Sequence, residues 1–432
     1  MLRFEGLILA LALILLGTAR AEGPVCVPVN GVVCLVDEGG NAILDGFEDA
    51  FTVRDGALYA AGKRGNYRLY DAAGNALGDA AFAMVYDAGD CLIFRQGNLY
   101  GAMDDAGAVI LPPEWTQLVS DGEGGFLALA SDPLDETSDE ILRVDAMGET
   151  TPTGVHTNIA FSPLRSGRMA VRAANGRYGA VNQRGELVVP KRWMGLSAFE
   201  DGLAIATGDA GVGLIDAHGR EVVAAVYDWI DRGDGIIAAL SEDRVDVYAA
   251  DGATLLYSVE GENLEAAVAD GCLLVRDGDA SKLYDQSGSV IGEFGPSFGC
   301  APGLNGQLIA WEGEWGEPRA WLMDPDGDAA SERFQHIVPL AGGRYAFATM
   351  KGVAYRSAEL GRVQTSWDYD SLRFGLMDSE GRELLPAEYR EIRALGEDRL
   401  LLVSDVEVRL TDLDGNAIKT WVTTEAEAPT GE

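Results

Sequence analysis

Basic residues are scarce in this sequence: 33 lysines and arginines stand against 69 aspartates and glutamates, which gives a formal net charge of −36. A surface this negative repels phosphate backbones and anionic lipid headgroups. The composition therefore argues against a nucleic-acid partner. It favours a protein whose charge keeps it soluble outside the cell, with a preference for cations or basic partners as the alternative.

The residues and motifs of metal, nucleotide and nucleophilic chemistry are also few. The histidines His156, His218 and His336 are scattered, and the sequence has no Cys-x-x-Cys, His-Glu-x-x-His, P-loop or dinucleotide motif. Gly295–Gly299 fits the Gly-x-Ser-x-Gly pattern, but the segment after it cannot start the helix that a nucleophile elbow needs. Carboxylates are too numerous for one glycosidase pair to stand out. We therefore predict no catalytic residue, no cofactor and no enzyme.

Only one long apolar run is present, at the amino terminus. Leu7–Leu16 follows Arg3 and precedes Ala19-Arg20-Ala21, which has the small-x-small pattern of a cleavage site. The run is short for a membrane span. We predict a signal peptide over residues 1–21 and a secreted or extracytoplasmic location without a membrane anchor; a retained segment is the alternative. The polar residues 423–432 are predicted to be a disordered tail.

Cysteine is limited to five residues, an odd number that leaves at least one thiol free or paired between chains. Cys26 and Cys34 flank Asn30-Gly31, a strong two-residue hairpin turn. That turn would place Cys34 opposite Val27 and Cys26 opposite Leu35, so the two thiols are one position out of phase. A Cys26–Cys34 disulfide would then require a bulge or a longer turn, and it stays an open alternative.

Glycine, by contrast, is abundant, with 55 residues that recur at regular intervals. Gly185 and Gly219 lie 34 residues apart, and each is followed eight positions later by an aromatic residue, Trp193 or Tyr227. A fixed period of this size indicates a repeat architecture. Each repeat contains Asp (or a substitute), two residues and Gly, a sequence suited to a tight reversal because Asp bonds the nearby backbone and Gly supplies positive φ. The eleven turn glycines are Gly40, Gly74, Gly107, Gly148, Gly185, Gly219, Gly252, Gly288, Gly327, Gly381 and Gly415.

Short alternating segments surround these turns, about three to a repeat, and no window outside the first residues has a helical pattern. We therefore predict an all-β fold over residues 22–422, built from about eleven antiparallel modules of about 34 residues and three strands each. Neighbouring modules must stack to bury their apolar faces, and we expect a propeller-like arrangement. The alternatives are an open solenoid or superhelical array, and two subdomains that meet near residue 200.

Three segments carry a resemblance to a known family. Tyr178–Trp193 contains Tyr-Gly-Ala-Val-Asn, the turn glycine, a Val-Pro pair and a final aromatic residue, and Tyr100–Trp115 and Phe374–Tyr389 follow the same plan. They resemble the bacterial WG (KWG) repeat, although Tyr, Val or Phe replaces the tryptophan that gives the repeat its name. The resemblance implies an all-β repeat protein, in a family usually without an assigned activity.

Two insertions, Ser131–Glu140 and Lys351–Tyr369, lengthen the repeat where a binding surface can be presented. Aromatic residues are dense around the second one, and exposed Trp and Tyr side chains stack on sugars or anchor peptides. The alternative is that they fill the core between repeats. The candidate binding residues are Trp311, Trp315, Trp321, Tyr355, Trp367 and Tyr369, of which Trp315 lies in the most loop-like sequence.

Asp324, Asp326 and Asp328 resemble the first half of a calcium loop, but the glutamate expected at the twelfth position is replaced by Gln335. They are weak candidates within an ordinary repeat turn, so we predict no metal. The sequence as a whole predicts an exported, non-catalytic β-repeat scaffold for protein or carbohydrate partners. A propeller-type glycan hydrolase that uses loop carboxylates and a structural envelope component are the alternatives.

Overall fold

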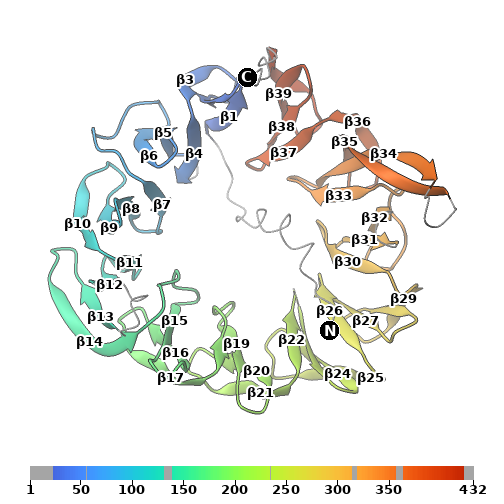
Figure 1. Ribbon diagram of the computed structural model, residues 1–432, viewed down its shortest axis with the longest axis horizontal. Helices are drawn as coiled ribbons and strands as arrows, with labels where there is room; N and C mark the ends of the chain where they lie inside the picture. The colour runs from blue at the N-terminus through green and yellow to red at the C-terminus, as the bar shows by residue number, and fades with distance from the viewer. Residues whose placement is uncertain are drawn as a thin grey trace.

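The computed structural model describes residues 23–54, 56–130, 139–233, 235–313, 319–356 and 363–422. These residues form β-strands in eleven separate antiparallel sheets and no helix. The sheets succeed one another in chain order around a ring (Figure 1). The predicted all-β repeat fold is confirmed: the protein is an eleven-bladed β-propeller. We number the blades in chain order.

Four blades have three strands in the described residues. They are blade 1, with β1 (Val25–Val29), β2 (Val32–Val36) and β3 (Ala42–Phe47); blade 2, with β4 (Asp49–Arg54), β5 (Leu58–Lys63) and β6 (Asn66–Asp71); blade 5, with β15 (Arg168–Arg172), β16 (Tyr178–Asn182) and β17 (Leu187–Trp193); and blade 9, with β30 (Gly299–Pro302), β31 (Leu308–Glu312) and β32 (Arg319–Met323).

The other seven blades have four strands. In the first half these are blade 3, with β7 (Met84–Asp87), β8 (Leu92–Gln96), β9 (Leu99–Met103) and β10 (Val109–Trp115); blade 4, with β11 (Gln117–Ser120), β12 (Phe126–Leu129), β13 (Asp139–Val144) and β14 (Thr150–Thr157); and blade 6, with β18 (Gly195–Leu196), β19 (Leu203–Thr207), β20 (Val212–Asp216) and β21 (Glu221–Tyr227).

In the second half they are blade 7, with β22 (Trp229–Arg232), β23 (Ile236–Ser241), β24 (Arg244–Ala249) and β25 (Leu255–Glu260); blade 8, with β26 (Glu265–Ala269), β27 (Cys272–Arg276), β28 (Ser281–Tyr284) and β29 (Val290–Phe294); blade 10, with β33 (His336–Pro339), β34 (Arg344–Arg356), β35 (Val363–Asp378) and β36 (Glu383–Tyr389); and blade 11, with β37 (Glu391–Leu395), β38 (Arg399–Val403), β39 (Glu407–Asp412) and β40 (Ala417–Val422).

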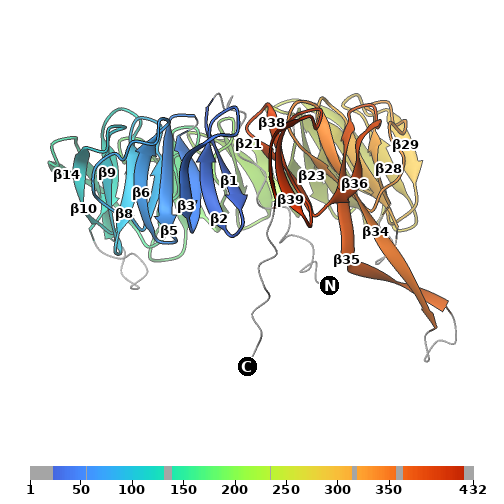
Figure 2. The same ribbon diagram turned by 90° about the horizontal axis from the view of Figure 1, so that it is seen from above.

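Most blades thus have one strand more than the three predicted. The added strand is the first of each four-stranded blade and lies nearest the ring axis (Figure 1). It has only two to five residues, for example β7 (Met84–Asp87) and β18 (Gly195–Leu196). A segment this short shows too little alternation to be recognised as a strand. Figure 2 shows the ring from the side, with β34 and β35 extending beyond it.

Every blade has the same turn at its outer side, between its last two strands in nine blades and after its last strand in blades 2 and 9. Each of the eleven turn glycines donates its N–H to the carbonyl oxygen three residues earlier at 2.8–3.1 Å. Their φ angles lie between +70° and +90°, a region that favours glycine. In Asp71–Asn75, the Asp71 carboxylate also accepts the N–H groups of Ala73 at 2.9 Å and Asn75 at 2.8 Å. This is a type I turn followed by a left-handed residue.

The turn glycines also lie against the preceding blade. A Cβ atom added to Gly381 in blade 10 would lie 2.5 Å from the carbonyl oxygen of Ala330, which follows β32 of blade 9. The same arrangement brings Gly219 against Val189 of blade 5. Gly40 of blade 1 in turn approaches Lys419 of blade 11. Ten of the eleven turn glycines therefore meet two requirements, positive φ and close approach, and Gly148, whose added Cβ would lie 3.9 Å from Leu111, meets the first alone.

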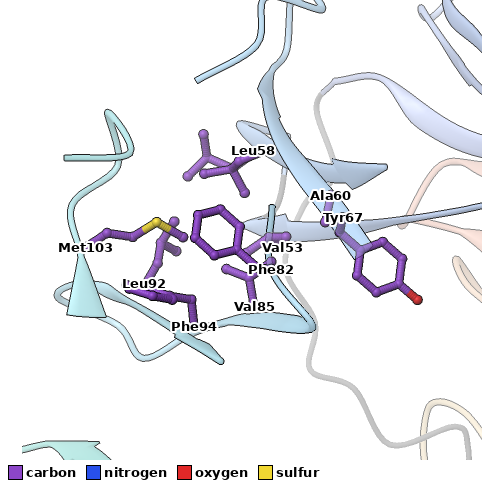
Figure 3. Packing of buried hydrophobic residues seen from close by; sticks show 10 residues of the cluster. Val53, Leu58, Ala60, Tyr67, Phe82, Val85, Leu92, Phe94 and Met103 are labelled. Atoms are coloured by element: carbon purple, nitrogen blue, oxygen red, sulfur yellow. The ribbon is translucent and has the colours of Figure 1, made fainter. Parts of the chain in front are cut away.

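The hydrophobic core lies between blades rather than within them. Figure 3 shows Leu58 and Phe82 of blade 2 packed against Leu92, Phe94 and Met103 of blade 3. The rings of Phe82 and Phe94 lie 4.9 Å apart, centre to centre. Each of the buried clusters joins two neighbouring blades in this way. One such cluster combines residues on both sides of position 200, with Trp193 of blade 5 and Phe199 of blade 6.

The same packing closes the ring. Val25 and Val27 of blade 1 pack against Leu401 and Leu410 of blade 11. The Arg399 guanidinium adds a hydrogen bond of 2.7 Å to the carbonyl oxygen of Gly23. In the described residues, blades 1 and 11 share no strand, so side-chain packing joins the two ends of the chain. This closure excludes the alternative of an open array.

The amino-terminal hairpin has the register that its turn predicts. Cys26 lies opposite Leu35, and Cys34 lies opposite Val27, which puts the two cysteines on opposite faces of the hairpin. Both thiols are free, so the Cys26–Cys34 disulfide does not form. Burial raises the pKa of Cys26 to about 12, and its thiol therefore stays protonated. The part of the chain that the structure describes contains no helix able to span a membrane.

Candidate binding face

The ring has two different faces because antiparallel strands reverse at alternate ends. One face carries the eleven turns that end in a turn glycine, and we call it the turn face. The connection one strand earlier in each blade lies on the opposite face, which we call the hairpin face. On the hairpin face the connections differ in length, from Asn30-Gly31 in blade 1 to the large hairpin of blade 10.

The hairpin of β34 and β35 is the largest departure from the repeat. Its strands have 13 and 16 residues, whereas the other strands have two to eight. The two strands pair with each other from Arg344 and Asp378 in the ring to Arg356 and Val363 at the far end, with one register shift between Thr349 and Lys351. The hairpin projects from the hairpin face, well beyond the ring (Figure 2). The insertion Lys351–Tyr369 therefore extends two existing strands.

Two other segments singled out in the sequence are flanked by described strands. Strands β12 and β13 flank residues 131–138, and β31 and β32 flank residues 314–318. In each pair these are the second and third strands of the blade, so the strand ends that flank these residues lie on the hairpin face. Most of Ser131–Glu140, and Trp315, lie outside the described residues.

Two of the candidate aromatic residues are part of the core. Trp321 has 4% of its surface exposed and packs between blades 8 and 9. Cζ of Arg333 lies 4.2 Å from the centre of its ring. Trp311 is opposite Ala320 on the neighbouring strand and is half-buried between blades 9 and 10. These two tryptophans thus fill adjacent blade interfaces, as the alternative interpretation of the aromatic region expects.

The remaining candidates belong to the hairpin. Tyr369 has 74% of its surface exposed, where β35 departs from the ring. Tyr355 pairs with Gln364, and Trp367 pairs with Gly352, by their backbones. The side chains of Tyr355 and Trp367 lie outside the described part of the chain. The aromatic region of the sequence therefore divides into core residues of blade 9 and hairpin residues of blade 10.

Asp324, Asp326 and Asp328 lie on the turn face, in the ordinary turn of blade 9. The Gly327 N–H donates to the Asp324 carbonyl oxygen at 2.9 Å, as in the other turns. One carboxylate oxygen of Asp324 accepts the Gln307 side-chain amide at 2.9 Å. Among the residues that the structure describes, no three His, Cys, Asp or Glu side chains form a group able to hold a metal ion.

A concavity of about 520 Å³ opens between blades 3, 4 and 5. Its lining includes the aromatic rings of Tyr86, Tyr100 and Phe161 and the amides of Gln117 and Gln183. Burial raises the pKa of Tyr86 to about 12, so its hydroxyl is neutral at physiological pH. This site could not be found from the sequence, because its residues come from three blades and no motif connects them.

The carboxylates of this concavity are already engaged. Arg54 bonds the Asp87 carboxylate at 2.6 Å, and it also pairs with Asp105. Asp121 is buried and accepts the backbone N–H groups of Glu123 and Gly125, each at 2.8 Å. Carboxylates held by such bonds order the blade ends and are poorly placed to act as an acid and base pair.

Comparison with known proteins agrees with this architecture. The fold defines a β-propeller assembled from repeats. The family model described as a WG containing repeat matches residues 178–207, which run from β16 to β19 across the boundary of blades 5 and 6. The chain therefore contains a WG repeat at these residues. No curated protein sequence matches it.

The solved structures that match this chain share little sequence with it. BamB from Moraxella catarrhalis is 14% identical, with 72% of this chain and 91% of BamB covered and a TM-score of 0.27. AztD from Citrobacter koseri is 13% identical, with coverage of 72% and 93% and a TM-score of 0.30. PorZ from Porphyromonas gingivalis, described as a surface component of the type-IX secretion system, is 12% identical, with coverage of 92% and 72% and a TM-score of 0.25. These values support no transfer of function.

Proposed function

We propose that this protein is an exported, non-catalytic scaffold that binds a protein or carbohydrate partner through the hairpin face of blades 9 and 10. The hairpin of β34 and β35 is the observation that carries the proposal. Beyond Thr349 and Arg373 its strands pair only with each other in the described residues. The extension therefore adds little to the packing of the ring, and a partner gives a reason for its presence.

Three further observations support parts of this proposal. The carboxylates of the turns and of the concavity are engaged in backbone bonds and ion pairs, which favours a scaffold over a hydrolase. The apolar segment Leu7–Leu16 and the small residues after it favour export. A net charge of −36 favours partners with exposed basic groups over anionic ones.

The test removes the extension and leaves the ring. Residues 350–372 are replaced by Asn-Gly, a two-residue turn that joins the paired residues Thr349 and Arg373. We expect a melting temperature close to that of the full chain, because no cluster of the ring core includes the removed residues. We also expect loss of the components that the full chain captures from the envelope fraction of its own cell.

Two results would contradict the proposal. One is capture that survives removal of the hairpin while the ring stays folded. The other is turnover of a glycan that a single Asp or Glu substitution abolishes, which would establish the hydrolase alternative. If the variant without the hairpin captures less and also melts at a lower temperature, the hairpin stabilises the fold. This result too would contradict a binding role.

A further inference from the structure

The projecting hairpin has an unpaired outer edge along β34. Within the ring, β33 pairs with β34 from Tyr345 to Ala348. The last backbone bond of this pairing runs from the Gln335 N–H to the Ala348 carbonyl oxygen at 3.0 Å. The strand β34 then continues for eight residues to Arg356.

A side chain takes the next position on this edge. The Gln335 amide nitrogen donates to the Met350 carbonyl oxygen, and the Gln335 amide oxygen accepts the Met350 N–H, both at 3.2 Å. A carboxamide that makes both bonds reproduces the two hydrogen bonds of a strand residue. The Met350 backbone therefore presents a donor and an acceptor in strand geometry beyond the end of β33, and the Gln335 side chain takes both.

The same edge continues along the extension. The Lys351 N–H points the other way, toward β35, where it donates to the Ser371 hydroxyl at 2.8 Å. Because backbone groups alternate along a strand, those of Gly352, Ala354 and Arg356 face the same side as Met350. In the described residues, strand pairing on this side of β34 ends at Ala348, so no strand pairs with these groups. The segment Gly352–Tyr355 has no proline and no charged residue, the usual protections of an edge strand.

The edge of β35 is less suitable. Its pairing with β34 jumps from Arg373 to Asp368, which leaves residues 369–372 outside the backbone register with β34. Within this bulge the Ser371 hydroxyl donates to the Asp368 carbonyl oxygen at 2.6 Å, and the Asp370 N–H donates to the Asp368 carboxylate at 3.2 Å. The bulge therefore interrupts the outer edge of β35 beyond the end of β36. The outer edge of β34 continues past the end of β33 without such a bulge.

We infer that the outer edge of β34 binds an extended segment of a different polypeptide as an added β-strand. This inference rests on the proposed function and names its partner class. Main-chain hydrogen bonds to Gly352, Ala354 and Arg356 supply the affinity, and the strand enters in line with β33. A second copy of this chain is disfavoured as the occupant, because two molecules of charge −36 repel each other.

The test uses a matched pair of proline substitutions in the full chain. Ala354 and Thr365 are directly opposite each other, so both direct their backbone groups outward, one on each edge. Ala354→Pro removes a donor from the β34 edge, and Thr365→Pro removes one from the β35 edge, without loss of a bond inside the hairpin. The probe is a synthetic peptide selected by the unmodified chain from a library of random peptides.

We expect the peptide to slow amide hydrogen exchange at Gly352, Ala354 and Arg356 and not at Val353 or Tyr355. We expect Ala354→Pro to weaken peptide binding about tenfold or more, and Thr365→Pro to leave it unchanged. The inference is overturned if no peptide is selected, if both variants bind equally well, or if protection appears elsewhere. Self-association that Ala354→Pro abolishes would also overturn it in favour of a second copy.

The inference and the proposed function fail in different ways. If replacement of the hairpin abolishes capture from the envelope fraction but Ala354→Pro does not, the hairpin binds its partner through side chains. Strand addition is then rejected, and the scaffold function stands. If neither change affects capture, both are rejected.

Discussion

The turn face and the hairpin face are built from the same strands and differ in how far they vary. On the turn face, eleven reversals share one hydrogen-bond pattern and one glycine conformation. On the hairpin face, the connections run from two residues in blade 1 to the projecting hairpin of blade 10. We infer that contact with the neighbouring blade, more than the turn itself, limits how far a connection can vary in length.

The physical basis is the position of the turn glycine. Gly327 faces the Ile291 carbonyl oxygen of blade 8, and Gly415 faces Leu385 of blade 10. On the hairpin face, Gly31 and Gly65 also have positive φ, but an added Cβ would meet nothing within 4 Å. Insertions are therefore tolerated on the hairpin face and excluded from the turn face.

The largest predicted effect separates these two kinds of glycine. Gly381→Ala should lower the free energy of unfolding by about 3 kcal/mol, because positive-φ strain adds to a clash with the Ala330 carbonyl oxygen. Gly65→Ala should cost only about 1 kcal/mol, since it adds the strain alone. Urea unfolding of both variants measures the difference. Equal losses would mean that conformation alone fixes the turn face.

An intermediate effect concerns pH. Bonds from Asn41 lower the pKa of Asp37, those from Asn75 lower the pKa of Asp71, and those from Ser287 lower the pKa of Asp285. A folded-state pKa below the unfolded value contributes stability above the unfolded pKa, and this contribution is lost as pH falls through the folded pKa. The urea midpoint should therefore decline once the pH falls below about 4.

Asp71→Asn provides the matched control for this acid effect. Asn182 already occupies the equivalent position in blade 5 and accepts the same backbone bonds from Arg184 and Glu186. The variant should therefore keep its turn and its stability at neutral pH, while it loses part of the acid dependence. An unchanged midpoint from pH 7 to pH 2 in the unmodified chain would show that the turn carboxylates are not what holds the turn face.

The sequence could predict the turn face because each turn is local. Four consecutive residues determine the geometry at Gly185 or Gly219, so the period and the eleven modules follow from the chain itself. The resemblance of Tyr178–Trp193 to a WG repeat agrees with the match at residues 178–207. The short inner strands were missed because β18 has two residues and β7 has four.

The hairpin face could be predicted only as a place where the chain is longer. Lys351–Tyr369 extends β34 and β35 because the two strands pair in one particular register. The alternation of apolar and polar residues in this segment does not determine that register. The sequence around Trp311 and Trp321 does not show whether these side chains are exposed. They are covered because blades 8 and 10 pack on the two sides of blade 9. The role of Gln335 follows from its distance to Met350, for which the sequence has no signal.

The smallest effect on folding provides the sharpest test between the faces. Tyr369 on the hairpin face and Met147 on the turn face have 74% and 86% of their surfaces exposed. Replacing either with alanine should change the free energy of unfolding by no more than about 0.5 kcal/mol, because neither side chain is part of the core. Only Tyr369→Ala should weaken capture of the envelope partner, since exposed aromatic side chains anchor interfaces. Weaker capture by Met147→Ala alone would assign binding to the turn face, and the uniform turns would then need a functional explanation beside the structural one.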